Sequence, residues 1–271
     1  MKDKVVIITG ASSGIGRSCA IAFAKRKAKI VLAARQQDKL TELVKVIEGM
    51  GAEVLAVKTD VRSEQDCEQL IKKTIERFHS IDILINNAGI SMRALFEELD
   101  LKVIREVMDT NFWGAIYCTK FALPYLLKAK GSVIGMSSIS GKKALPGRTG
   151  YCASKFALEG FLETLRLENL KTGLHVLIAC PGFTASNIRF TALAKDGSVQ
   201  GESPRDEAKM MQPEEVAEHL IDAIIKRKRN IVLTTQGKLV LWINKFLPAT
   251  LDKIIYTQMA KEPDSPFKQP T

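Results

Sequence analysis

Hydrophobic residues along the chain gather in seven short runs, which are separated by longer stretches whose apolar positions recur with helical spacing. Most of the runs are continuously apolar and rich in valine and isoleucine, which is typical of strands covered on both faces. The predicted strands are residues 5–9, 29–34, 53–58, 82–86, 132–137, 175–180 and 230–235.

The stretches between the runs predict amphipathic helices. One of them, SEQDCEQLIKKTIERF, opens with Ser63 and Asp66 at the spacing of a capping box. Strands that alternate with helices predict right-handed crossovers, and therefore a doubly wound parallel α/β sheet with helices on both faces. Residues 1–237 are predicted to form one domain and residues 238–271 a helical extension of it. A ligand would bind outside the carboxyl ends of the strands.

Composition narrows the class of protein only slightly, since 46% hydrophobic and 26% charged residues are ordinary for a globular protein. The net charge of +10 comes from Lys and Arg spread along the chain, with one cluster, KRKR, at 226–229. We interpret that cluster as a solvated helix end, although an anionic cofactor or a membrane surface is an alternative. No nucleic-acid partner is expected.

Cysteine and histidine usage excludes several kinds of site. The five cysteines stand at no metal-like spacing, which indicates core positions in a reduced, cytoplasmic setting. His79, His175 and His219 have no motif residues near them, so neither a Ser-His-Asp site nor a metal site is expected. The N-terminus lacks the pattern of a signal peptide, and no apolar run reaches the ~18 residues needed to span a bilayer.

A glycine-rich segment, TGASSGIG at 9–16, follows the first predicted strand and opens the first predicted helix. Gly10 permits a tight turn, Gly14 lets the backbone approach a pyrophosphate, and Gly16 lets the helix pack closely on the strand. A loop that is merely rich in glycine is the alternative, and the strand before and the helix after argue against it.

Three further motifs follow later strands: NNAG at 86–89, SS at 137–138 and YCASK at 151–155. With TGASSGIG, they resemble the motifs of the short-chain dehydrogenase/reductase family, in order over roughly residues 3–235. The resemblance implies a Rossmann-like seven-stranded parallel sheet, a nicotinamide cofactor, and a homodimer or homotetramer. It also implies that cofactor contacts come from Gly10, Ser12, Ser13, Gly14, Ile15, Gly16, Asn87, Ala88 and Gly89.

Tyr151 and Lys155 stand four positions apart on a predicted helix, so their side chains project from one face. A free tyrosine has a pKa near 10, and an adjacent ammonium would stabilise the phenolate. Lowering that pKa by about three units needs roughly 4 kcal/mol. The pair would then be a tuned general acid and base, whereas a surface pair of the same spacing is the alternative.

Ser138 argues against the surface pair, because it stands 13 residues before Tyr151, the separation that the resemblance requires. By resemblance, its hydroxyl holds the substrate oxygen beside the phenol. Asn111 is a poor helix residue, which indicates a specific hydrogen-bonding task. The resemblance implies that this task is to hold a helix kink and a water in a proton relay through Lys155, which also holds the nicotinamide ribose.

Two other segments are expected on the cofactor side. The second strand ends in Ala33-Ala34-Arg35 without an acidic residue, so Arg35 would pair with a 2′-phosphate and favour NADP(H) over NAD(H). A surface role that only caps the strand is the alternative for Arg35. By resemblance, Asp60 and Val61 lie near the adenine, and the segment PGFTAS meets the nicotinamide carboxamide. The residues assigned to it are Pro181, Gly182, Thr184 and Ser186.

The C-terminal segment 238–261 carries two apolar stripes at helical spacing, one on each side of Pro248. It resembles the extension of the hydroxysteroid and lipid ketoreductase branch, so we expect it to cover the cleft and the substrate to be an apolar carbonyl or alcohol. Core packing and a dimer interface are the alternatives, and peripheral contact with a membrane is a further expectation.

The leading hypothesis is thus an NADP(H)-dependent oxidoreductase that transfers hydride between nicotinamide and a carbonyl or secondary alcohol. A catalytically silent dinucleotide sensor or scaffold on the same fold is the rival. Such a protein would be expected to lose part of the catalytic set, and here all four members are present: Asn111, Ser138, Tyr151 and Lys155.

Overall fold

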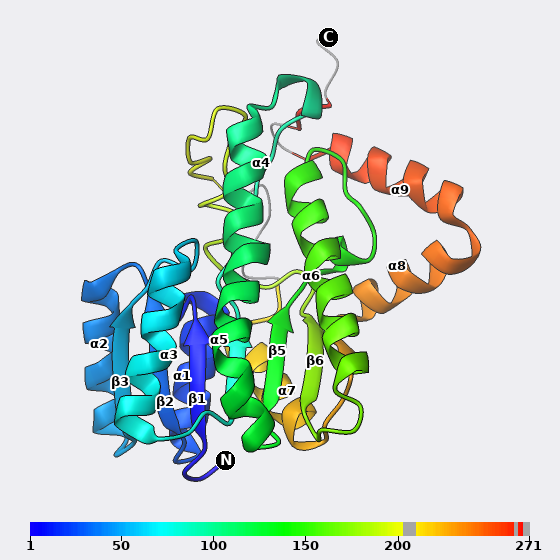
Figure 1. Ribbon diagram of the computed structural model, residues 1–271. Coiled ribbons are helices and arrows are strands. Elements are labelled where there is room, and N and C mark those ends of the chain that lie inside the picture. Colours follow the sequence, from blue (N-terminus) through cyan, green and yellow to red (C-terminus); the bar gives the residue numbers. More distant parts are fainter. Residues whose placement is uncertain (203–209, 263–264, 268–271) are drawn as a thin grey trace.

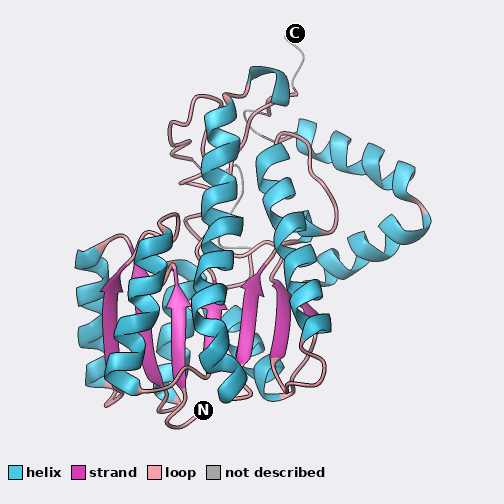
Figure 2. Cartoon of the chain, in the orientation of Figure 1, coloured by secondary structure: helices cyan, strands magenta, loops and turns pink. Residues whose placement is uncertain are grey.

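One parallel sheet of seven strands forms the centre of the molecule (Figure 2). The computed structural model describes residues 1–202, 210–262 and 265–267. The strands are β1 Val5–Thr9, β2 Lys29–Ala34, β3 Val54–Lys58, β4 Ile83–Asn86, β5 Ser132–Met136, β6 His175–Cys180 and β7 Asn230–Val232. Their order is β3-β2-β1-β4-β5-β6-β7, so the order reverses between β1 and β4, where such sheets bind ligands.

Helices cover both faces of this sheet, as the alternating pattern predicts (Figure 1). The helices are α1 Gly14–Lys25, α2 Gln37–Gly49, α3 Glu64–Phe78, α4 Leu101–Met108, α5 Gly114–Lys128, α6 Thr149–Glu168, α7 Pro213–Ile225, α8 Thr235–Phe246 and α9 Pro248–Ala260. Three short helical turns are η1 Phe96–Glu98, η2 Asp109–Trp113 and η3 Ile139–Gly141.

The continuously apolar strands are explained by two separate cores, one on each face. Val6 and Ile8 of β1 pack in one core with α1, α2 and α7, whereas Val5 and Ile7 pack in the other with α3, α5 and α6. All five cysteines are free and buried, so their predicted core positions are confirmed.

Several predicted boundaries need correction. The seventh strand ends at Val232 and not at residue 235, because the Thr234 hydroxyl already accepts from the Gly237 amide (3.1 Å) and caps α8. Consequently the predicted boundary after residue 237 falls inside a helix. The Ser63 hydroxyl caps α3 by accepting from the Asp66 amide (3.1 Å), but the Asp66 carboxylate accepts from the Asp60 amide (2.9 Å), so the capping box is only half formed.

The α8–α9 hairpin projects from the side of the molecule near the carboxyl ends of β5 and β6 (Figure 1). Leu251 and Met259 are buried, whereas Leu239, Trp242 and Phe246 are exposed. Among the helices of the described ranges, none is long and apolar enough to cross a bilayer.

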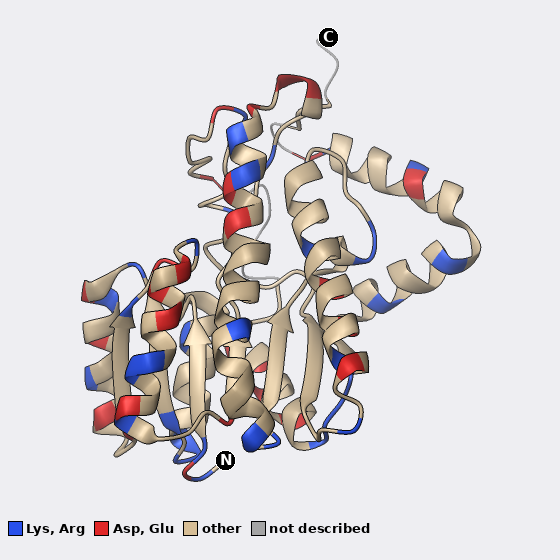
Figure 3. Ribbon diagram, viewed as in Figure 1, with Lys and Arg blue, Asp and Glu red and all other residues tan. Residues whose placement is uncertain are grey.

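The basic residues do not collect on one element. Lys and Arg alternate with Asp and Glu on α2 and α3 (Figure 3). The KRKR cluster follows the end of α7 at Ile225 and is exposed, as expected of a solvated helix end.

Candidate active site

The glycine segment between β1 and α1 is closed by contacts of backbone with backbone. Gly10 has φ +65°, and a Cβ there would lie 2.9 Å from the Ala88 Cα. A Cβ on Gly16 would lie only 2.3 Å from the Gly10 carbonyl oxygen. Glycine is therefore required at both positions by the close approach of the chain.

The last residue of β1 and the residue after β4 fasten this turn with their side chains. The Asn87 amide nitrogen donates to the Thr9 carbonyl (2.9 Å), and the Thr9 hydroxyl accepts from the backbone amides of Asn87 and Ala88 (3.0 Å each). Thr9 was missed by the sequence analysis, although a threonine directly before the glycine segment was a visible signal. The predicted cofactor residues Asn87 and Ala88 thus lie against the turn.

The first turn of α1 has the properties of an anion site. Ser13 is the N-cap in extended conformation, and within the described part of the chain its side chain accepts no capping hydrogen bond. No acidic residue occurs in this turn. Its amide groups and the positive end of the helix dipole therefore face outward, together with half-buried Ser12, Gly14 and Ile15.

Asn111 lies in η2, a π-helical turn that joins α4 to α5. Its Oδ1 accepts from the Ile90 amide (2.8 Å), while its Nδ2 donates to the Ile90 carbonyl (2.9 Å) and to the Ser154 hydroxyl (2.9 Å). A π-helical turn interrupts the α-helical pattern at Asn111, and its side chain makes specific hydrogen bonds there, while its part in a proton relay stays a prediction. The side chain thereby connects the loop after β4 to the helix that carries Tyr151.

Tyr151 and Lys155 share one face of α6, with the Lys155 ammonium 5.7 Å from the centre of the tyrosine ring. Lys155 donates to the Met136 carbonyl at the end of β5 (2.8 Å). Burial lowers the pKa of Lys155 to about 8. Burial raises the pKa of Tyr151 above its ordinary 10.0, and the opposite effects of Ser138 and Arg148 do not overcome it. The expectation of a lowered tyrosine pKa is therefore wrong for this structure, because desolvation outweighs the nearby charges.

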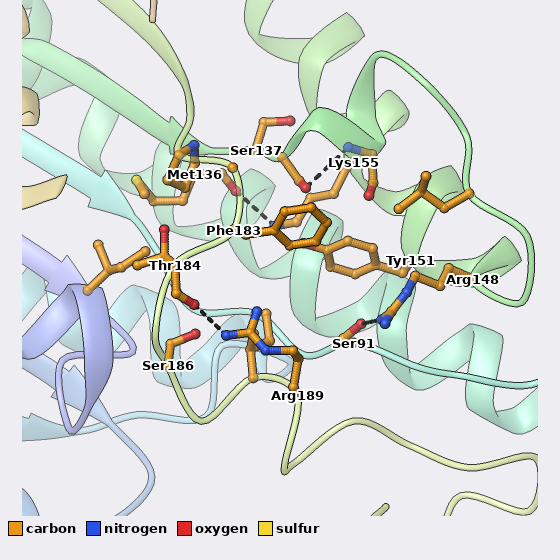
Figure 4. A pocket seen from close by; sticks show the side chains of 18 of the residues that line it. Ser91, Met136, Ser137, Arg148, Tyr151, Lys155, Phe183, Thr184, Ser186 and Arg189 are labelled. Carbon is orange, nitrogen blue, oxygen red and sulfur yellow. Dashed lines mark hydrogen bonds between the residues drawn. The ribbon is translucent and has the colours of Figure 1, made fainter. Parts of the chain in front are cut away.

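A cavity of ≈ 150 Å³ lies between the carboxyl ends of β1, β4, β5 and β6 (Figure 4). Of the predicted catalytic set, Ser138, Tyr151 and Lys155 line it, and buried Asn111 lies behind them. The lining also includes these predicted cofactor residues: Ile15, Asn87, Gly89, Pro181, Gly182, Thr184 and Ser186.

Thr184 provides a test of whether this cavity fits a nicotinamide cofactor. Its hydroxyl oxygen is buried and has no hydrogen-bond partner among the described residues. A buried, unpaired hydroxyl is costly, and a carboxamide group would satisfy it. With the glycine turn at one end and this hydroxyl at the other, the residues present fit such a cofactor.

Arg35, Asp60 and Val61 lie on the other side of β1, at the ends of β2 and β3. Arg35 is exposed, and Val61 is buried. Asp60 pairs with Arg62 (2.6 Å), and this partner, more than the charge of Arg35, lowers the pKa of the Asp60 carboxyl. The Asp60 carboxylate is thus occupied by Arg62, a residue that the sequence analysis did not single out.

Several other lining residues were also missed. Arg148, directly before α6, and Arg189, in the segment after β6, both reach the cavity wall. Met259 of α9 and Glu262 after it also line the cavity, so the end of the C-terminal segment reaches it, and the expectation that the whole segment covers the cleft stays a prediction. An arginine three residues before Tyr151 was a usable signal in the sequence, whereas the contact of the C-terminal segment depends on the path of the chain.

A second polar cluster lies beneath the cavity. Glu159, one turn beyond Lys155 on α6, accepts from the Ser137 hydroxyl (2.5 Å) and pairs with Lys142 (2.6 Å). Burial lowers the pKa of the Lys155 ammonium, and the Glu159 carboxylate offsets only part of that lowering. Ser137 is therefore occupied by Glu159, which leaves Ser138 as the serine that faces Tyr151.

Comparisons with known proteins agree with this geometry. A sequence model described as short chain dehydrogenase matches residues 4–196. The chain is 34% identical over 273 residues to 11-beta-hydroxysteroid dehydrogenase A of Sesamum indicum, which covers 98% of this chain and 78% of that protein. It is 32% identical over 268 residues to dehydrogenase/reductase SDR family member 7B of Mus musculus, with 97% and 83% covered.

Solved structures show the same fold. An alcohol dehydrogenase from the archaeon Thermococcus sibiricus, complexed with 5-hydroxy-NADP, is 26% identical with a TM-score of 0.75, over 86% of this chain and 98% of that chain. A short-chain dehydrogenase/reductase from Burkholderia phymatum in complex with NAD is 22% identical with a TM-score of 0.81, over 100% and 98%. The chain belongs to the hydroxysteroid branch of the short-chain dehydrogenase/reductase family and is an NAD(P)-dependent oxidoreductase that acts on CH–OH groups.

Proposed function

We propose that this protein interconverts an apolar ketone and the corresponding secondary alcohol with NADP(H), using Asn111, Ser138, Tyr151 and Lys155. The observation that carries the proposal is that Ser138, Tyr151 and Lys155 line the same cavity as Thr184, whose hydroxyl is unpaired. When bound, the nicotinamide supplies or accepts the hydride at the substrate carbon.

The chain's own residues handle the proton and the substrate oxygen. Because burial raises its pKa, Tyr151 is a neutral phenol at pH 7 and can donate its proton to a carbonyl oxygen during reduction. Ser138 would donate a hydrogen bond to the same oxygen. Lys155 would hold the cofactor ribose with its ammonium. Asn111 fixes the loop at Ile90 against α6, and a proton relay through Lys155 would begin at this position.

A panel of ketones with NADPH tests this proposal against a silent dinucleotide sensor. We expect steroid-like and long-chain ketones to be reduced with higher kcat/KM than acetone or cyclohexanone, as followed by loss of NADPH absorbance. NADPH binding without turnover of any ketone would support the sensor.

The preference for NADP(H) is proposed to come from Arg35. Arg35 is exposed at the end of β2, and the Asp60 carboxylate, on which its charge acts, is already paired with Arg62 (2.6 Å). Arg35→Asp should therefore reverse the ratio of kcat/KM for NADPH and NADH, because a carboxylate repels the 2′-phosphate and accepts from a 2′-hydroxyl. An unchanged ratio would show that residues other than Arg35 set the cofactor preference.

The α8–α9 hairpin is proposed to cover the substrate side and to contact a membrane surface peripherally. Met259 reaches the cavity, while Trp242 and Phe246 present an exposed aromatic pair with ring centres 5.4 Å apart. Truncation after Gly237 should raise KM for steroid-like ketones more than for small ones. Co-sedimentation with anionic liposomes tests the membrane contact, and light scattering tests the proposed homodimer or homotetramer.

A further inference from the structure

Arg148 places a cationic group beside Tyr151 without an acidic partner. It is the N-cap of α6, and one guanidinium nitrogen donates to the Ser91 hydroxyl (2.9 Å) and, at 3.4 Å, to the Met92 carbonyl. No carboxylate of the described ranges lies within ion-pair distance of Arg148. Figure 4 shows its guanidinium between Ser91 and Tyr151 at the edge of the cavity.

Arg148 is the cation of the lining that lies beside Tyr151, and Glu262 is an acidic residue of the same lining. Glu262 is already paired with Arg93 (3.3 Å), and both of these side chains are almost fully buried. Glu262 acts on Arg148 only at longer range, and burial lowers the pKa of the Arg148 guanidinium despite it. Partly desolvated positive charge of this kind is stabilised by an anion.

The remainder of the wall is largely apolar. Leu145, Phe183, Ile188 and Met259 come from three separate segments of the chain and line the same cavity. A ligand that matches both parts of the wall must therefore be amphipathic, with an anionic group near Tyr151 and an apolar remainder.

We propose that Arg148 is an anion-binding, specificity-determining residue, and that the substrate carries a carboxylate or phosphate close to its reacting oxygen together with an apolar chain or ring. This inference rests on the proposed function, since Tyr151 defines which oxygen reacts. Arg148 binds the anionic group through the guanidinium donors that Ser91 and Met92 leave free, because the guanidinium has five N–H donors in total.

The kinetic test compares 3-oxododecanoate with its methyl ester, which has the same chain and ketone but no charge. Hydrogen bonds to charged groups are worth about 1.5–3 kcal/mol, so the parent should favour the acid by roughly ten- to hundredfold in kcat/KM. Arg148→Gln can still donate to Ser91, yet it should bring the ratio to about one, mainly through KM for the acid. Arg148→Lys should restore part of the preference.

The matched control is Lys143→Met, which removes a nearby cation that pairs with Asp252 and does not line the cavity. This control should leave the preference unchanged. A purely structural role for Arg148 predicts that Arg148→Gln, which can keep the hydrogen bond to Ser91, preserves the preference, or that both substrates lose activity equally. Either result would overturn the proposal.

A binding measurement keeps this proposal separate from the proposed function. Calorimetric titration of decanoate into the protein with NADP⁺ should show at least tenfold weaker binding for Arg148→Gln than for the parent, whereas decanol should bind both equally. Decyl phosphate distinguishes the two anions: tighter binding than decanoate assigns a phosphate, and weaker binding a carboxylate. Equal binding of decanoate by parent and Arg148→Gln would refute the anion site. If Arg148→Gln loses decanoate binding while the parent reduces no ketone, the result would support the anion site and refute the proposed reaction.

Discussion

The cofactor side and the substrate side of the cavity are built in different ways. On the cofactor side, adjacent segments of the chain are in contact through their backbones, as at Gly10 and Gly16, and Asn87 fastens them from the neighbouring strand. On the substrate side, Arg148 and Met259 arrive from segments more than a hundred residues apart. The first side has little room for variation in sequence, whereas the second can change its side chains without disturbing the sheet.

The cofactor side is built to bind a dinucleotide, whereas the substrate side is built to discriminate between substrates. A dinucleotide is recognised through backbone amides and a helix end, and these features require glycine and a fixed turn. A substrate is recognised through side chains on loops and on the C-terminal hairpin, supported by the rigid sheet. Tyr151 and Lys155 stand where the two sides meet, because α6 packs on the sheet and its first turns face the cavity.

The largest effect on activity is expected at Tyr151, where the two sides of the cavity meet. Tyr151→Phe should lower kcat by at least about a hundredfold, because it removes the proton donor and little else. Intrinsic fluorescence quenching should show unchanged NADPH affinity, and Tyr256→Phe, at an exposed position on α9, should have wild-type kinetics. Activity within tenfold of the parent would remove Tyr151 from its proposed role.

The buried Lys155 ammonium should make the free energy of unfolding depend on pH. Its pKa falls from 10.5 to about 8 on folding, so between these values the unfolded chain binds more protons and stability rises with pH. Below pH 8 the parent carries a cost of about 3 kcal/mol that Lys155→Met lacks. The free energy of unfolding of Lys155→Met should thus exceed that of the parent at pH 7, and the gap should close toward pH 10.5.

Urea denaturation at several pH values measures this gap. Lys128→Met, at an exposed position on α5, is the control and should follow the parent throughout. A gap that stays constant from pH 7 to 10.5 would show that Lys155 is not desolvated.

The glycine turn can be tested with two matched substitutions. Gly16→Ala should destabilise the protein by about 1–3 kcal/mol and weaken NADPH binding, because its Cβ would overlap the Gly10 carbonyl. Gly160→Ala, in the middle of α6, meets no atom within 4 Å and should stabilise by up to about 1 kcal/mol. Equal effects in chemical denaturation would mean that the cofactor side is less constrained than its geometry implies.

The smallest effect is expected on the hairpin. Trp242 is 62% exposed, so Trp242→Ser should change the free energy of unfolding by less than about 0.5 kcal/mol. A larger loss that depends on protein concentration would instead show that this face is buried between copies of the chain.

Much of the site was predictable because its chemistry is local in the sequence. Tyr151 and Lys155 share a helical face by spacing alone, and the glycine segment needs only the strand before it and the helix after it. The position of Asn111 in a π-helical turn agrees with its poor fit to a helix interior. The family resemblance added the order of these motifs and their expected roles.

The sequence by itself determined the seven strands, their coverage on both faces and the local spacing of the motifs, because these follow from periodicity and from the conformational needs of glycine. Only the tertiary structure decided the direction of the Tyr151 pKa, which depends on how deeply several elements together bury the phenol. It alone paired Asp60 with Arg62, and it alone brought Arg148, Met259 and Glu262 to one cavity wall. Burial and long-range charge arise from the sum of contacts between distant segments, and no single stretch of the chain contains that sum.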